Sequence, residues 1–278
     1  MATIKSSNIN ITDLDFEDVS QSLKEYLKGQ TILKDYNFEG SNLSILIDLL
    51  AYAAHTSAFN ANMVASEGKI VIIPIILIFF IGIFINHLID DSLSWLKYFN
   101  YFSFSFLLFT LYFFRNPKRK PVGTSNQMVS PADGKVIQII NVDDPDISNA
   151  KQISIFLSIF NVHSQYVPID SSVISSNYFS GKYLLAFNHK ASSKNEQSTT
   201  LFKTKENNKY KIKQIAGFIA RRILNYMESD QSVIKGQRLG FIRFGSRVEI
   251  IVSSNNFDII VKKGDKIKAN ISTIGIFK

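Results

Sequence analysis

The chain has 278 residues, 46% of them hydrophobic, and a formal net charge of +8 at pH 7. This length allows one or two domains with a buried core. The absence of cysteine excludes disulfide bonds and thiolate chemistry and is compatible with a reducing compartment. The positive charge suits an anionic partner, and lipid is favoured over nucleic acid because no basic-aromatic nucleic-acid motif occurs.

Residues 1–67 form the first region, in which two helices are predicted. Val19, Leu23 and Leu27 have the four-residue spacing of a helix face. A second helical run covers about residues 41–67, where leucines make an apolar face. No cluster of catalytic residue types occurs in this region, and its start lacks the basic and apolar segments of a signal peptide.

Two stretches of the first region are distinctive, Met1–Phe16 and Gly40–Thr56. They resemble the N-terminus of a T4-type phage baseplate wedge subunit, a much longer protein, and the resemblance stops near Glu67. Residues 1–67 are therefore expected to be a fragment joined to a different protein. A natural fusion and a junction made by recombination, or by assembly of mixed DNA sequences, are both open.

Residues 69–120 contain two charge-free apolar stretches, Ile70–Ile89 and Tyr98–Phe114. A membrane-spanning helix needs about 20 apolar residues, with roughly 17 to 25 tolerated. A transmembrane helical hairpin is therefore predicted, with the polar link His87–Ser94 joining its two helices. The alternatives are a helical pair buried in a soluble core and a shallow hairpin that does not cross the bilayer.

Basic residues follow the second apolar stretch immediately, at Arg115, Lys118, Arg119 and Lys120. Cytoplasmic flanks of membrane helices carry an excess of Lys and Arg. The sequence therefore predicts a protein of the cell membrane with its downstream domain on the cytoplasmic side.

Residues 121–278 are predicted to be mostly β with a few helices. Helical spacing over Gln214–Tyr226 predicts one helix packed on a sheet. Gly264-Asp265 predicts a turn between two strands and, with Asp133-Gly134, is similar to the barrel-sandwich architecture of lipoyl carriers. No Gly-rich phosphate loop or metal-ligand spacing occurs, so no metal site is expected. Apolar runs between turn signals predict strands at Lys135–Val142, Gln152–Phe160, Val248–Ser253 and Phe257–Val261.

Three residues in separate segments suggest nucleophilic chemistry: Asp133, His163 and Ser246. A serine hydroxyl needs a base to take its proton, and His163 is the best candidate for that base. Asp133 is the candidate for orienting and stabilising the imidazolium. No standard serine-hydrolase signature surrounds Ser246, which instead follows Gly245 directly.

A glycine before the serine allows a different reaction, because glycine adopts backbone conformations denied to other residues. With the carbonyl of Gly245 presented to it, the hydroxyl of Ser246 can attack and shift the acyl group from nitrogen to oxygen. Elimination from the ester leaves dehydroalanine, which hydrolyses to a pyruvoyl group and ammonia. The product is a protein-derived carbonyl that acts as an electron sink.

Ordered motifs over residues 69–278 support this chemistry. They are Arg115-Asn116-Pro117, Ser130–Val136, Phe160–His163, His189–Ser192, Asn195-Glu196, Gln214–Arg222, Gly236–Gly240 and Gly245–Val248. Together they resemble a phosphatidylserine decarboxylase of the short bacterial type. One position departs from that family, which usually has Arg where Gln197 stands. If that Arg binds the lipid phosphate, Gln197 would weaken substrate binding while self-cleavage survives.

The resemblance implies a processing triad of Asp133, His163 and Ser246 and a cut between Gly245 and Ser246. A membrane-bound β chain (1–245) would stay with an α chain (246–278) that begins at the pyruvoyl cofactor derived from Ser246. This pyruvoyl would convert phosphatidylserine to phosphatidylethanolamine through a Schiff base. The expected partners are an anionic phospholipid and the membrane, without nucleic acid, and an oligomer is left open. The alternative is a structural baseplate fragment fused to an inactive decarboxylase.

Overall fold

The computed structural model describes residues 64–88, 94–184, 194–217, 222–243 and 246–278. Residues 65–278 form one compact unit, distinct from residues 1–64. The described part is mostly β, as predicted, with two long helices and a short 3-10 helix at Ser66–Gly68. The helices predicted within residues 1–67 lie largely outside the described residues.

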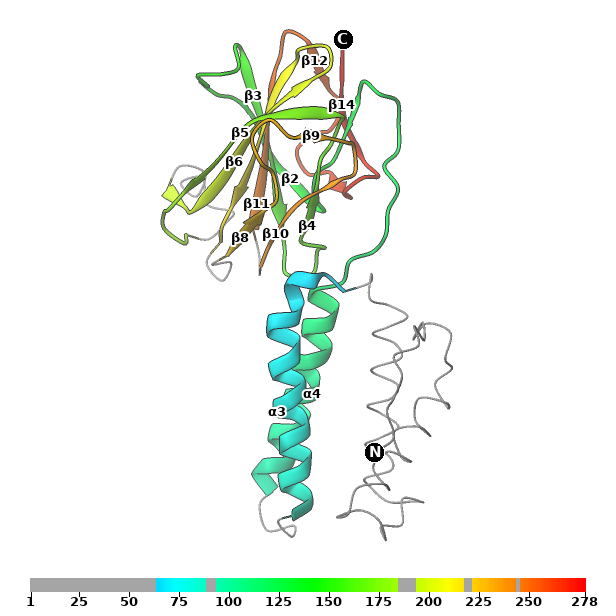
Figure 1. Ribbon diagram of the computed structural model, residues 1–278, viewed down its shortest axis with the longest axis vertical. Helices are drawn as coiled ribbons and strands as arrows, with labels where there is room; N and C mark the ends of the chain where they lie inside the picture. The colour runs from blue at the N-terminus through cyan, green and yellow to red at the C-terminus, as the bar shows by residue number, and fades with distance from the viewer. Residues whose placement is uncertain (1–63, 89–93, 185–193, 218–221, 244–245) are drawn as a thin grey trace, which may run out of the picture. The chain divides into compact units, whose positions relative to one another are not determined.

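The two long helices, α3 (Lys69–Leu88) and α4 (Ser94–Phe113), pack along each other (Figure 1). Their approach is close, because a Cβ atom at Gly82 would lie 2.2 Å from Oδ1 of Asn100. By length and composition, one helix in the described residues could cross a membrane, at Ser66–Asn86. The first predicted span meets this criterion and the second does not.

An eight-stranded antiparallel sheet makes up most of the remaining structure. Its strand order is β13-β2-β3-β11-β7-β6-β5-β9. The strands are β2 (Gly134–Asn141), β3 (Ala150–Leu157), β5 (Ser171–Phe179), β6 (Gln197–Thr204), β7 (Lys209–Ile215), β9 (Ser232–Val233), β11 (Ser246–Ser253) and β13 (Lys266–Ile267). Successive side chains of a strand point to opposite faces, so the alternate apolar positions of β3 and β11 build one core face.

Two three-stranded antiparallel sheets complete the fold, with the orders β1-β14-β12 and β4-β10-β8. They contain β1 (Gln127–Val129), β4 (Ser164–Tyr166), β8 (Ile223–Asn225), β10 (Arg238–Ile242), β12 (Phe257–Ile259) and β14 (Thr273–Phe277). The four strands predicted from apolar runs are confirmed as β2, β3, β11 and β12.

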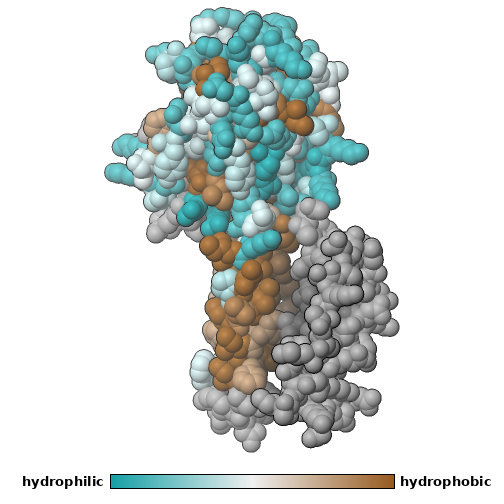
Figure 2. Space-filling view, in the orientation of Figure 1, coloured by the Kyte–Doolittle hydropathy of each residue, from teal (hydrophilic) through white to brown (hydrophobic). Residues whose placement is uncertain are grey.

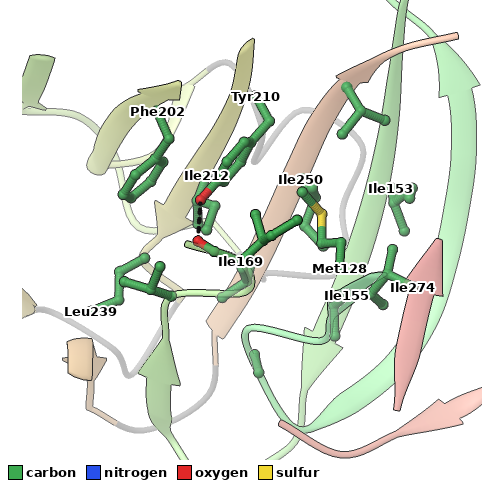
Figure 3. Packing of buried hydrophobic residues seen from close by; sticks show 14 of the residues in the cluster. Met128, Ile153, Ile155, Ile169, Phe202, Tyr210, Ile212, Leu239, Ile250 and Ile274 are labelled. Carbon is green, nitrogen blue, oxygen red and sulfur yellow. Dashed lines mark hydrogen bonds between the residues drawn. The ribbon is translucent and has the colours of Figure 1, made fainter. Parts of the chain in front are cut away.

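The core lies between the large sheet and the segments packed on its apolar face (Figure 3). Ile153, Ile155 and Ile250 contribute from the central strands β3 and β11. The rings of Phe202 and Tyr210 stack with their centroids 4.9 Å apart. This packed face fixes the central strands, and with them the strand ends that carry the predicted site residues.

One local prediction is wrong, and a second is confirmed with a different strand pairing. In the described parts of the predicted helix Gln214–Tyr226, residues 214–217 and 222–226, the chain forms the end of β7 and the whole of β8 instead, because both strands find partners in the sheets. The turn at Gly264-Asp265 exists, but the strands beside it pair elsewhere, β12 with β14 and β13 with β2. The turn is attached to β2 instead, since Gly264 N–H donates to the carbonyl of Val136 at 2.7 Å.

Candidate active site at one end of the large sheet

Three strand ends meet at one end of the large sheet. Strand β2 begins directly after Asp133, β3 ends at Leu157, and β11 begins at Ser246, which pairs with Leu157. Because β3 separates the other two strands, the backbones at Asp133 and Ser246 are about 10 Å apart at a strand spacing of about 4.8 Å. Gly134 permits the approach to β3, since a Cβ atom there would lie 2.4 Å from the carbonyl oxygen of Phe156.

His163 reaches the same region from a different sheet. It directly precedes β4, and its carbonyl accepts a hydrogen bond from the backbone N–H of Ile242 at 3.4 Å. Ile242 ends β10, from which the chain continues within a few residues to Ser246. The fold therefore brings the segments of all three predicted site residues together.

The imidazole of His163 is fully buried and lies against aromatic rings. Its centroid is 4.4 Å from that of Phe113, the last residue of α4, and 6.4 Å from that of Phe241. Phe114 stacks on Phe241 at 5.5 Å. This aromatic surround excludes water from one side of the imidazole.

Burial lowers the pKa of His163 to about 4. The nearby Arg115 also lowers this pKa, while the backbone carbonyl of Asn161 and the carboxylate of Asp133 raise it. His163 is therefore neutral at physiological pH. Nδ1 lies 2.9 Å from the carbonyl oxygen of Asn161, which can only accept, so Nδ1 carries the proton. The lone pair that can take up a proton then sits on Nε2.

Asp133 is held by a partner that the sequence did not single out for this role. Both of its carboxylate oxygens are engaged by the guanidinium of Arg119, and Oδ1 also accepts the backbone N–H of Ala269 at 2.8 Å. Asp133 thus acts on His163 through its charge. Spacing offered no signal for this pair, because Arg119 fits equally well into the run of basic residues after the second apolar stretch.

Ser246 is fully buried, and its hydroxyl has no hydrogen-bond partner among the described residues. A buried hydroxyl left unsatisfied costs about 1–3 kcal/mol, so such groups are rare outside functional positions. A pyruvoyl group derived from Ser246 fits here, because it has no hydroxyl to satisfy. Gly245, the other residue of the predicted cut, lies outside the described residues.

Directly after Ser246, strand β11 carries a buried ion pair on the opposite face of the sheet. Nε of Arg247 lies 2.7 Å from Oε1 of Glu249, although the N–H does not point along that line. Gln152 and Ser154 donate to the same carboxylate oxygen at 3.0 and 3.3 Å. The sequence carried no specific signal for this network, because Arg and Glu two residues apart are equally typical of a solvated strand face.

A pocket of about 380 Å³ lies at the same end of the sheet, lined by Tyr178, Tyr183, Glu196, Arg222 and Ile223. The hydroxyl of Tyr183 donates to the Glu196 carboxylate. Next to the pocket-lining Glu196, Gln197 begins β6, and its buried Oε1 has no partner within the described residues.

Comparison with known proteins gives two family matches. A model of the phosphatidylserine decarboxylase family matches residues 106–275, and a model of the helical domain of gp6-like baseplate wedge proteins matches residues 15–69. Both predicted resemblances are confirmed. The alternative of a baseplate fragment fused to an inactive decarboxylase is not favoured by these matches.

Curated relatives cover the same part of the chain. The phosphatidylserine decarboxylase proenzyme of Prosthecochloris aestuarii is 42% identical over 171 residues, which are 60% of this chain and 77% of the relative. The proenzyme of Chlorobium chlorochromatii is 41% identical over 177 residues, covering 63% and 82%, respectively. That of Cytophaga hutchinsonii is 44% identical over 147 residues, covering 52% and 67%. The chain, through its C-terminal three-fifths, belongs to the phosphatidylserine decarboxylase family.

Proposed function

We propose that this chain is a self-processing decarboxylase that converts phosphatidylserine to phosphatidylethanolamine with a pyruvoyl group derived from Ser246. The observation that carries the proposal is the buried hydroxyl of Ser246, which has no hydrogen-bond partner among the described residues, at the strand end where Asp133 and the neutral His163 also lie. The relatives' names supply the substrate class.

Self-cleavage uses groups of the chain alone. Nε2 of His163 takes the proton of the Ser246 hydroxyl, whose oxygen attacks the carbonyl carbon of Gly245 and displaces the backbone nitrogen. Elimination from this ester releases the Gly245 carboxylate as the end of the β chain, and water then releases ammonia from the new terminus. The charge of Asp133, fixed by Arg119, stabilises the imidazolium that forms.

The chemistry supplied at position 246 is that of an electrophilic carbonyl, which condenses with a primary amine and accepts electrons released by a departing carboxylate. The surrounding residues orient the headgroup and control protons. We propose that His163, after taking up a proton at Nε2, donates it to carbon when carbon dioxide has left. The aromatic rings of Phe113 and Phe241 keep water away from this proton transfer.

A membrane anchor fits this activity because the lipid substrate stays in the bilayer. We propose that α3 and α4 form the transmembrane hairpin, since their exposed surface is apolar, whereas the surface of the β sheets is mainly hydrophilic (Figure 2). The basic residues after α4 would then face the cytoplasmic leaflet and attract anionic lipid. In this proposed orientation, the catalytic domain lies on the cytoplasmic side of the cell membrane.

The division of the chain follows from the same reasoning. We propose a baseplate-wedge-like segment over residues 1–67, the hairpin and basic stretch over 69–120, and the decarboxylase domain over 121–278. Glu67 is already attached to the decarboxylase domain, because its carboxylate pairs with Arg238 at 2.7 Å and accepts the Tyr226 hydroxyl at 2.9 Å. The barrel-sandwich description of the β domain stays a prediction.

The intact mass of the detergent-purified chain tests the proposal. We expect a fragment of residues 246–278 that is lighter by one ammonia than its serine-initiated form, together with a fragment of residues 1–245. The Ser246→Ala variant should remain uncut and should release no carbon dioxide from phosphatidylserine. A wild-type chain that stays uncut under the same conditions would refute the proposed function.

A further inference from the structure

A tight turn, residues 158–161, connects His163, the proposed general base, to the protein surface. The backbone N–H of Asn161 donates to the carbonyl of Ser158 at 2.9 Å, and Oδ1 of Asn161 accepts both the backbone N–H and the hydroxyl of Ser158. The carbonyl of Asn161 in turn accepts the proton on Nδ1 of His163. The turn is thus held from both sides, and of its two remaining side chains Ile159 is partly buried, whereas Phe160 is 60% exposed.

The same turn is bound to the last turn of α4. The carbonyl of Phe160 accepts a hydrogen bond from Nη2 of Arg115 at 2.7 Å and from the hydroxyl of Tyr112 at 3.3 Å. The Arg115 guanidinium lies 4.0 Å from the centre of the Tyr112 ring. Phe160 is therefore fixed beside the point where the apolar surface of α4 gives way to basic residues.

We propose that Phe160 inserts into the phospholipid bilayer at its interface and thereby holds the opening of the catalytic site against the lipid surface. This inference rests on the membrane-anchored decarboxylase proposed above. A bilayer is the occupant that fits, because the exposed Phe160 is bound through its carbonyl to Tyr112 in the last turn of α4 and to Arg115, and Lys118 and Lys120 follow Arg115 in the chain as further cations for lipid phosphates. Aromatic rings and basic side chains are the residues enriched at membrane interfaces.

A second exposed aromatic residue supports this orientation. Tyr226 is 43% exposed, and its hydroxyl donates to Glu67, two residues before the start of α3 at Lys69. An exposed aromatic residue therefore lies near the start of α3, at Tyr226, and near the end of α4, at Phe160. With Phe160 inserted, His163, three residues later in the chain, would lie at about the same membrane depth as the serine headgroup of the lipid.

Activity on two forms of the substrate tests the inference. Phe160→Asp should lower decarboxylation of phosphatidylserine in phosphatidylcholine vesicles by about tenfold or more, because a buried aromatic ring is lost from the interface. Decarboxylation of water-soluble dihexanoyl-phosphatidylserine, and self-cleavage, should stay unchanged. Ile234→Asp, at a 68% exposed position away from α4, is the matched control and should leave both activities unchanged. Unchanged activity of Phe160→Asp on vesicles, or an equal loss on both substrates, would overturn the inference.

Fluorescence quenching measures insertion independently of catalysis. The chain has one tryptophan, Trp95, so Phe160→Trp in a Trp95→Phe background reports from the turn alone. We expect vesicles with bromine near the headgroup end of the acyl chains to quench this fluorescence, and a Trp that is unquenched in them would overturn the inference. If the wild-type chain acts on neither substrate, the proposed function fails, while the quenching result still decides whether Phe160 inserts.

Discussion

The ion pair between Arg247 and Glu249 allows a quantitative test of what holds the catalytic strand in place. Both side chains are almost completely buried, with exposed fractions of 1% and 0%. Replacing Arg247 with Met keeps most of the side-chain volume but leaves the carboxylate of Glu249 buried without its cation. The two donors Gln152 and Ser154 remain.

Removing one partner of a buried ion pair costs about 3–5 kcal/mol, because the remaining charge loses that partner without regaining water. Since the carboxylate keeps two hydrogen bonds, we expect Arg247→Met to cost about 3 kcal/mol. For a domain of this size that corresponds to a fall of roughly 6–12 °C in melting temperature. Replacing both partners with apolar residues, as Arg247→Met with Glu249→Leu, should restore most of the loss, because no buried charge is left.

Thermal unfolding in detergent measures these effects. All variants are made with Ser246→Ala, so that differences in self-cleavage do not alter the covalent structure. The control is Lys151→Met on the neighbouring strand β3, because this half-buried lysine makes no ion pair with a described residue. This variant should change the free energy of unfolding by no more than about 0.5 kcal/mol. A single variant that melts like its parent, or a double variant no more stable than the single one, would refute the reasoning.

Three further predictions concern the site itself. The pKa of His163 is about 4 in the folded chain, against its ordinary value of 6.5, so between these pH values the unfolded chain binds more protons. The neutral imidazole therefore contributes to the stability of the folded Ser246→Ala chain above pH 6.5. This contribution is lost as the pH falls to 4. Unfolding at pH 7 and pH 4.5, compared with the same measurement on His163→Gln, should show about 2 kcal/mol of pH dependence that the variant lacks. Arg119→Met should slow self-cleavage, which is followed by gel electrophoresis. Arg119→Lys should restore part of the rate, because a cation then again faces Asp133. Equal rates for the two variants would contradict a positioning role of Arg119. Gly134→Ala should lower the melting temperature by several degrees, because its Cβ atom would lie 2.4 Å from a backbone oxygen of β3, and an unchanged value would show that the strands can separate at this point.

The sequence predicted the strands whose apolar residues are consecutive in the chain and missed those whose pairing depends on distant segments. Strands β2, β3 and β11 carry apolar runs that identify them directly. Strand β5 begins Ser171-Ser172, and its many polar residues gave no strand signal, although it pairs along its whole length with β6. The predicted helix over Gln214–Tyr226 failed for the related reason that local spacing carries no information on the partners of β7 and β8.

The site shows the same division between local and distant information. Ser246 and His163 could be selected because a nucleophile and a base have few candidate residue types in a chain with four histidines and no cysteine. The partners that tune them could not be selected in this way. The carbonyl of Asn161 carries no side-chain signature, and Arg119 lies 14 positions from Asp133 among other basic residues.

The position of the proposed cut would allow the chain to break its backbone at Ser246 and still keep that residue in place. Strand β11, which begins at Ser246, lies between β3 and β7, and the later strands β13 and β14 pair with β2 and β1. All four partners come from residues before the cut, so separating the α chain would require breaking four strand ladders at once. We therefore expect the two chains to co-purify in detergent and to separate only in denaturant. An α chain lost during gentle gel filtration would show that these ladders do not hold the product together.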